Sequence, residues 1–482
     1  MIRSASDSSQ FNVIRRRDPA SGDLARPTEP ESRPRDQELS EPQHGVITAW
    51  VMKLGPVMLW LLVLLVPLAF SLSARENFRL PKLWLSQTLG LASIVFLLAR
   101  AKIVGRLDLK ALVRQPVVLA VLPMLIVATL GLLTSPHDQA VRGALISLWI
   151  GLACLVVWSY ALTTSELRDL LEGMIFPATQ LALVAVLQYH HIVNPFQIVG
   201  EVERLRLTSL AGSAFDLAAY FVLPCLLVQG SLRQTSTSAS WRWTQGLCAA
   251  LSVYALALTQ TLSAILALAC GTLLFWFLVL SRRRFVGLAA GLILAALALG
   301  LAVEPLQQRV SNKLGSLRQG DVNELLSGRL DGWRAALWMA REEPWTGVGH
   351  GAYRFEFGRA REALKQQGVE LFPSRYQGYF FNAHNDLLEA VAEWGIPGAV
   401  AVAWAIGVLL WTLRRSRAAG KRQETVVMWS GLAGLTVLAL TNFPLRIALV
   451  AYPTLLFLSW IFATSRELDE TSSQTRQNAA AG

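Results

Sequence analysis

Apolar runs of about 20 residues recur along most of the chain, and a helix of that length crosses about 30 Å of hydrocarbon. Runs such as Leu59–Ala69 and Gly287–Val303 show none of the alternation of a barrel strand, the other structure that satisfies backbone groups in lipid. The pattern therefore predicts an all-α polytopic membrane protein with about twelve transmembrane helices. We expect them near residues 54–72, 82–100, 116–134, 141–162, 169–189, 213–230, 243–260, 262–281, 285–303, 394–413, 424–441 and 445–463.

The formal net charge of +11 does not indicate a nucleic-acid partner, because the basic residues gather in alternate loops. They cluster at Arg100–Arg114, Arg282–Arg284 and Arg414–Arg422. Loops rich in Lys and Arg face the cytoplasm. We therefore expect both termini inside, and the loops at 190–212 and 304–383 on the external face.

Polar segments lie before, between and after these spans. Residues 1–45 are rich in Pro, Ser, Arg and Glu, a composition typical of a disordered tail. The segment after Ser465 is also polar, and we expect it to be unstructured. The predicted organisation is a cytoplasmic tail (1–45), nine helices (46–303), a long external loop ending in a candidate catalytic segment (304–393), three helices (394–464) and a second cytoplasmic tail (465–482).

The long loop is expected to be functional, because connections of this length without a role are uncommon. It is also expected to be partly helical. Apolar residues recur at helical spacing over Asn323–Arg341, and a second stretch, Ala352–Gln367, could be helical and lie along the membrane surface.

His384 is the best candidate for chemistry, because it lies where this loop meets the next span. Asp386, Glu389 and Glu393 follow at spacings that place them on one helical face, and Gly395 and Gly398 then break or reset the helix. Three interpretations remain open. The segment is an amphipathic helix capped by His384 and Asn385, a metal site of the histidine and carboxylates, or a general base that takes a proton from a hydroxyl.

Four arginines fall on the same expected side as His384, against the usual charge bias: Arg204, Arg206, Arg329 and Arg334. Guanidinium groups stay charged and bind phosphate oxygens bidentately, so a diphosphate is their natural partner. For any single arginine, contact with lipid headgroups is the simpler interpretation. The other external histidines, His190, His191 and His350, are expected to be polar surface residues.

Several motifs resemble the bacterial O-antigen ligase and polymerase superfamily. His384-Asn385, nine further residues, then Gly395 and Gly398 matches its pattern. The segments 327–333, 343–351 and 206–213 resemble the family's loop and arginine signatures, and the resemblance covers roughly residues 50–465. One departure is Ala214-Phe215-Asp216, where relatives often carry an Asn-Pro-Asn-like turn. We expect Asp216 to cap the following helix.

The resemblance implies a GT-C-like, metal-independent, inverting membrane glycosyltransferase without a cofactor. Its donor would be a glycan on a polyprenyl (undecaprenyl) diphosphate at the periplasmic face of the bacterial inner membrane. By the same resemblance, His384 would activate the acceptor hydroxyl. Arg206 and Arg329 would bind the donor diphosphate, with Arg334 and Arg204 as further candidates. Asn385, Gly395 and Gly398 would have supporting roles.

The family resemblance leaves the acceptor open. An O-antigen ligase that uses lipid A–core oligosaccharide is our first hypothesis. A polymerase that joins repeat units is the alternative, and a protein O-oligosaccharyltransferase is a more distant one. A transporter is the hypothesis from another class, but the chain shows no internal repeat and its charges lie at span ends.

Overall fold

A computed structural model describes residues 42–74, 76–193, 207–233, 238–302, 304–371, 379–420 and 422–481. The chain forms two units, Met1–Ile47 and Thr48–Gly482, and the second is considered below. In the described residues, every regular element is a helix, which confirms the predicted all-α class. Most of the predicted N-terminal tail, residues 1–41, lies outside the described residues.

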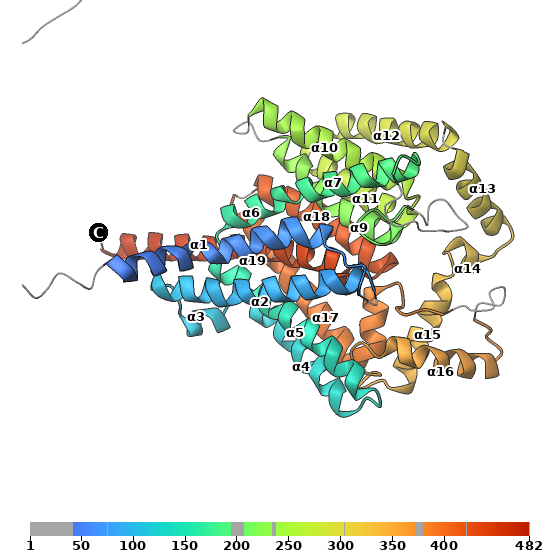
Figure 1. Cartoon of the computed structure of the whole chain (residues 1–482), viewed down its shortest axis with the longest axis horizontal. Coiled ribbons are helices and arrows are strands. Elements are labelled where there is room, and N and C mark those ends of the chain that lie inside the picture. Colours follow the sequence, from blue (N-terminus) through green and yellow to red (C-terminus); the bar gives the residue numbers. More distant parts are fainter. Residues whose placement is uncertain are drawn as a thin grey trace, which may run out of the picture. The chain divides into compact units, whose positions relative to one another are not determined.

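The helices follow one another along the chain (Figure 1). The α-helices are α1 (Pro42–Leu65), α2 (Arg79–Ile103), α3 (Leu109–Val113), α4 (Pro116–Leu130), α5 (Asp138–Ala161), α6 (Thr164–Gly173), α7 (Ile175–Tyr189), α9 (Ala214–Ser231), α10 (Ala239–Leu258), α11 (Leu262–Val279), α12 (Arg282–Ala302), α13 (Glu304–Arg318), α14 (Val322–Leu325), α15 (Arg329–Glu342), α16 (Tyr353–Gln366), α17 (Asp386–Ala418), α18 (Arg422–Thr441) and α19 (Ala448–Ala481). Three short 3-10 helices are η1 (Val66–Leu68), η2 (Gly131–Leu133) and η3 (Pro444–Arg446).

Ten candidate membrane spans, rather than the expected twelve, are found in the described residues. They are Thr48–Leu68, Arg79–Ile103, Pro116–Leu133, Asp138–Ala161, Thr164–Tyr189, Ala214–Ser231, Leu262–Val279, Asp386–Ala418, Gln423–Thr441 and Ala448–Ser472. The protein is therefore a multi-pass membrane protein. The other two expected spans coincide with α10 and α12. The first half of α10 is too polar for a span, since it contains Arg242 and Gln245.

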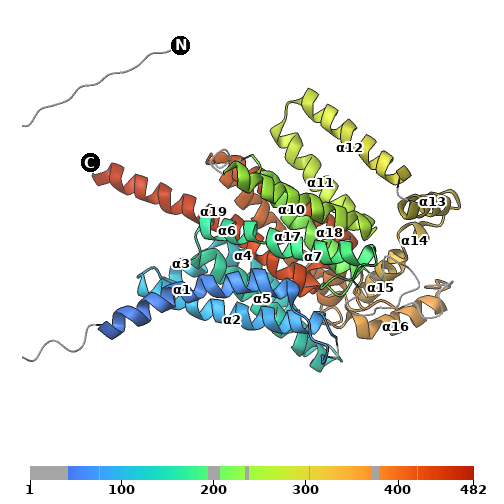
Figure 2. The same cartoon turned by 45° about the horizontal axis from the view of Figure 1, so that its top comes forward.

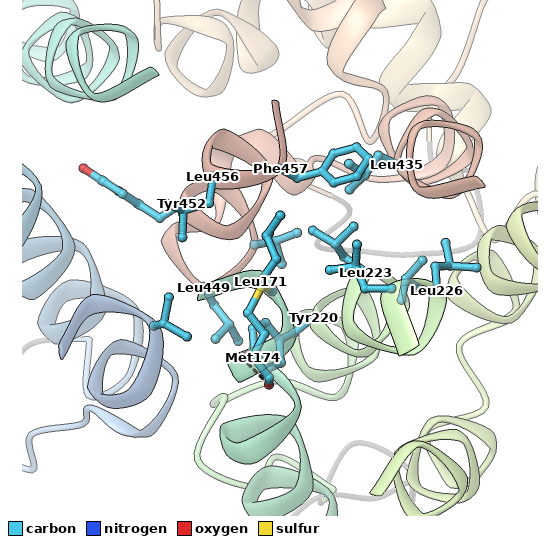
Figure 3. Close-up of a cluster of buried hydrophobic side chains, with 14 of the residues drawn as sticks. Leu171, Met174, Tyr220, Leu223, Leu226, Leu435, Leu449, Tyr452, Leu456 and Phe457 are labelled. Carbon is cyan, nitrogen blue, oxygen red and sulfur yellow. Dashed lines mark hydrogen bonds between the residues drawn. The ribbon is translucent and has the colours of Figure 1, made fainter. Parts of the chain in front are cut away.

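Helix α9 lies at the centre of the apolar core, because it is apolar on all sides and is buried along nearly its whole length. Figure 3 shows its residues Tyr220, Leu223 and Leu226 among side chains from neighbouring helices. Leu171 and Met174 come from the α6–α7 junction, Leu435 from α18, and Leu449, Tyr452, Leu456 and Phe457 from α19.

The long loop is folded onto the bundle. Helix α15 packs against α16 and α17, as both views show (Figures 1 and 2). A second apolar cluster joins these helices, with Trp338 of α15, Phe357 of α16, and Ala390 and Trp394 of α17 among its members. The predicted helix at Ala352–Gln367 is confirmed as α16. The one predicted over Asn323–Arg341 is instead split into α14 and α15.

The split occurs at Ser327 and Gly328, which have left-handed φ values of 58° and 80°. Each contributes to a sharp turn that a continuous helix does not allow. The turn lets α15 begin at Arg329, the residue that matters for the site described below.

The prediction that the segment after Ser465 is unstructured was wrong, because α19 continues to Ala481. No proline or glycine occurs between Ser465 and Gly482. Polar contacts also hold the turns that follow Ser465: Arg466 Nη2 donates to Leu162 O at 2.9 Å, and Arg415 pairs with Asp469.

Candidate functional site

The segment that carries His384 is fixed by the start of α17. Asn385 is the N-cap of this helix, and its Oδ1 accepts hydrogen bonds from the backbone N–H groups of Leu387 and Leu388 at 3.1 and 3.0 Å. This is the capping geometry of the amphipathic-helix interpretation. His384, immediately before it, has a left-handed φ of 56°, which is uncommon for a residue with a side chain. Such strain persists only where surrounding contacts hold it.

The imidazole of His384 lies between two aromatic rings. Its centroid is 4.6 Å from that of Phe380 and 4.9 Å from that of Phe443, which meets it edge-on. Nδ1 lies 3.1 Å from Asn382 O. Because a carbonyl oxygen only accepts, Nδ1 carries the proton in this bond and Nε2 keeps a lone pair. Asn382 thereby selects the tautomer suited to a base.

Burial, together with the positive charges of Arg329 and Arg79, lowers the pKa of His384 to about 4. The hydrogen bond to Asn382 O acts in the opposite direction. The imidazole is therefore neutral near pH 7. Two arginines from distant parts of the chain act on its charge state.

The carboxylates of α17 hold the neighbouring segments together. Glu389 and Glu393 are both 1% exposed or less, and both contact Arg446 of η3. Arg446 Nε lies 3.4 Å from Glu389 Oε1, and its Nη2 pairs with Glu393. Asp386 accepts from the backbone N–H of Leu445 at 3.3 Å. The predicted common face of these three carboxylates is confirmed, and it faces the α18–α19 connection.

The kink in α17 is made by Gly395, with φ 64° and ψ −161°, a conformation open essentially only to glycine. The predicted break at this residue is confirmed. A Cβ on Gly395 would lie 2.5 Å from Pro344 O, and Ile396 N donates to the same oxygen at 2.7 Å. The kink thus lets segment 344–351 of the long loop bond directly to α17. Gly398 follows at a position where a Cβ would lie 2.2 Å from that of Trp394.

His350 is buried, 6% exposed, so its prediction as a surface residue was wrong. Its Nδ1 lies 3.1 Å from Glu393 Oε2 and 3.2 Å from the indole nitrogen of Trp394. Burial and the charge of Arg446 lower the pKa of His350, against the effect of Glu393. This histidine is part of the packing between the loop and α17. His190 and His191 are exposed, as predicted.

The two long-loop arginines have different surroundings. Arg329 begins α15, donates to Leu326 O at 3.3 Å, and lies close enough to His384 to lower its pKa. Arg334 instead pairs with the buried Asp331 at 3.4 Å. Of the two, Arg329 is the one whose charge acts on His384.

Arg204 and Arg206 lie outside the described residues, but the chain directly after them is anchored. Ser209 donates from its backbone N–H to Gln188 Oε1 at 2.6 Å and from its hydroxyl to Leu181 O at 2.8 Å. Lys82 Nζ donates to Leu210 O at 2.7 Å. Next to them, a Cβ on Gly212 would lie 2.4 Å from Phe78.

Asp216 is not the cap of α9, and the prediction that it caps the helix was wrong. Ser213 is the N-cap, with its hydroxyl accepting from Phe215 N at 3.2 Å. Asp216 instead accepts two hydrogen bonds from Arg79, from Nε at 3.0 Å and from Nη2 at 3.1 Å. Arg79 was missed by sequence reasoning, as was Arg446. Each lies at the end of a helix close to His384.

The metal-site interpretation finds no support in the arrangement of the described side chains, where no group of three or more His, Cys, Asp and Glu could hold an ion. Glu389 and Glu393, two of the proposed ligands, are engaged with Arg446.

Comparison with known proteins finds a family match that covers the region around His384. Residues 247–403 match the family model for O-antigen ligase, and this range contains His384, Arg329, Asn385 and both motif glycines. No curated protein matches the chain. The family implies a membrane glycosyltransferase of the ligase type. Residues 247–403, which span the long loop and the His384 segment of this all-α multi-pass protein, are therefore similar to the O-antigen ligase family.

Proposed function

We propose that this protein is an O-antigen ligase that transfers a glycan from a polyprenyl diphosphate to a hydroxyl of lipid A–core oligosaccharide. The observation that carries the proposal is the neutral imidazole of His384 within electrostatic reach of the guanidinium of Arg329. One group can accept a proton and the other can stabilise a leaving diphosphate. Both lie within the matched family region.

In the proposed reaction, the acceptor oxygen attacks the anomeric carbon from the face opposite the diphosphate. His384 Nε2 takes the hydroxyl proton as the new C–O bond forms. The bond from the anomeric carbon to the phosphate oxygen breaks, and the electron pair leaves with the diphosphate. Attack from the opposite face inverts the anomeric configuration.

Arg329 and Arg206 are proposed to bind the diphosphate, and Arg334 and Arg204 are further candidates for the same role. Fixed cations at the position where negative charge grows stabilise the transition state without reorganisation. A bound diphosphate would also offset the positive charges that lower the pKa of His384. The histidine would then become a stronger base when the donor is present.

Asn385, Gly395 and Gly398 are proposed to support the base rather than to touch substrate. Asn385 caps the helix that follows the histidine, and Gly395 makes the kink against Pro344. The site is proposed to face the periplasm from the inner membrane, with both termini in the cytoplasm. That orientation follows from the basic loops on the other side.

Deletion of the gene in its own host tests the choice of acceptor. Loss of a ligase leaves lipid A–core without glycan, while full-length polymer accumulates on the polyprenyl carrier. Loss of a polymerase leaves single repeat units on lipid A–core. Gel analysis of lipopolysaccharide, with mass analysis of the carrier fraction, separates the two outcomes. Single-repeat bands would replace the ligase proposal with the polymerase alternative, and an unchanged pattern would refute both.

A further inference from the structure

We propose that Arg79, held in place by Asp216, is a further donor-phosphate-binding residue of this site. The inference rests on the proposed function, because it assigns one more contact to the same donor. Arg79 and Asp216 both lie outside residues 247–403, so the family match does not assign them. They come from the starts of two different helices, α2 and α9.

Asp216 fixes the orientation of the Arg79 guanidinium but uses only part of its hydrogen-bonding capacity. Asp216 is 1% exposed, and both its oxygens accept from Arg79, one from Nε and one from Nη2. A guanidinium has five N–H donors, so this fork fixes its plane and leaves donors on the opposite edge. The Arg79 side chain is 50% exposed, so the remaining edge is accessible to a ligand.

Arg79 lies close to the proposed base. Its Cζ lies 5.9 Å from the ring centroid of Phe443, the ring that meets His384 edge-on. Arg79 and Arg329 both lower the pKa of this histidine, which places both charges within electrostatic reach of the base. A diphosphate between the two arginines would meet cations from α2 and from α15.

Lys82 connects the Arg79 region to the segment that follows Arg206. Lys82, one turn after Arg79, is 2% exposed and donates to the carbonyl oxygens of Ala69 and Leu210. Lys82 also bonds to the segment that follows Arg206, and so it joins the Arg79 region to the other proposed phosphate-binding segment.

The alternative is that Arg79 and Asp216 form only a structural pair between α2 and α9. Binding of undecaprenyl diphosphate to the full-length protein in lipid nanodiscs separates the two roles. Arg79→Gln should weaken binding by about tenfold or more, because a charged hydrogen-bonding partner is lost. Arg79→Lys should have an intermediate effect, since it keeps the charge and loses the fork.

Arg142→Gln is the matched control. Arg142 is also an arginine near the start of a helix, paired with an aspartate, Asp138, at 3.0 Å, and on the same expected side. Its variant should bind undecaprenyl diphosphate as the wild type does. Thermal unfolding of each variant shows whether it is folded.

Wild-type affinity retained by folded Arg79→Gln would overturn the inference and leave the proposed function intact. Failure of both Arg79 variants to fold would assign the pair a structural role and would also overturn it. Absence of binding by the wild type would refute the proposed donor itself. These results are distinguishable in a single titration series.

Discussion

Glu389 accepts a hydrogen bond from the backbone N–H of Ala383, the residue immediately before His384, at 2.8 Å. The other carboxylate oxygen accepts from the side chain of Asn382 at 2.8 Å. Asn382 O is in turn the partner of His384 Nδ1. One buried carboxylate on the first turn of α17 therefore fixes both the strained backbone of the histidine and the group that selects its tautomer.

Glu389→Gln should lower kcat for glycan transfer by about tenfold or more and leave the donor KM nearly unchanged. The amide cannot accept from both Ala383 and Asn382, so the histidine loses its alignment while the phosphate-binding arginines remain. Steady-state kinetics with a polyprenyl-diphosphate-linked glycan measure the split. Glu342→Gln, at an exposed position of α15, is the control. A rise in KM alone would show that Glu389 does not position the base.

Arg446→Met should reduce the free energy of unfolding by about 3–5 kcal/mol, since it leaves Glu389 and Glu393 buried without their cation. Thermal unfolding in detergent is the measurement. Arg341→Met, which removes an exposed arginine from α15, should change stability by less than about 0.5 kcal/mol. Similar losses of unfolding free energy in both variants would show that Arg446 does not stabilise the buried Glu389 and Glu393.

Gly395→Ala should destabilise the protein by about 2 kcal/mol or more, because its φ and ψ suit glycine alone and a Cβ would meet Pro344. Gly407→Ala, in the same helix, is the matched comparison. A Cβ there meets nothing within 4 Å, so helix propensity should make the change neutral or stabilising. Equal unfolding temperatures for the two variants would contradict the assigned kink.

The pH dependence of kcat/KM should show an acidic limb near pH 4 rather than 6.5, because this parameter reports the free enzyme and the pKa of His384 there is about 4. The active form is the neutral imidazole, so activity is lost as pH falls through that value. The same lowered pKa makes the unfolded chain bind the extra proton. Stability contributed by His384 is therefore complete above pH 6.5 and declines as pH falls towards 4.

The stability part of this prediction needs a separate measurement. Unfolding of the wild type and of His384→Gln, compared between pH 7 and pH 4.5, gives the contribution of the histidine. The wild type should lose more stability over this range than the variant. An acidic kinetic limb near 6.5 would show that the imidazole is not buried as described.

The sequence predicted what depends on local pattern. Apolar runs identified the spans, and the spacing of Asp386, Glu389 and Glu393 placed them on one helical face. The predictions for Asp216 and His350 were wrong because residues far away in the sequence determine their surroundings. Asp216 looked like a cap because it opens a helix, but Arg79, 137 residues away, is its partner. His350 looked exposed because nothing near it in sequence shows that Glu393 and Trp394 bury it.

Arg79 and Arg446 were missed although a signal for them existed. Arg79 lies in a short connection between expected spans, and Arg446 is the second residue of the expected span 445–463, so both are arginines on the expected side of His384, against the usual charge bias. Neither lies in a recognisable motif, so only the fold shows that Arg79 reaches Asp216 and that Arg446 reaches two glutamates.

The role of His384 as the base is tested most directly by glycan transfer with purified His384→Gln protein. The assay follows transfer from a polyprenyl-diphosphate-linked glycan to lipid A–core, with His190→Gln, at an exposed position, as the control. His384→Gln should lose transfer by about 100-fold or more while it still binds undecaprenyl diphosphate, and the control should keep full activity. Transfer by folded His384→Gln at a rate close to that of the wild type would contradict the proposed mechanism.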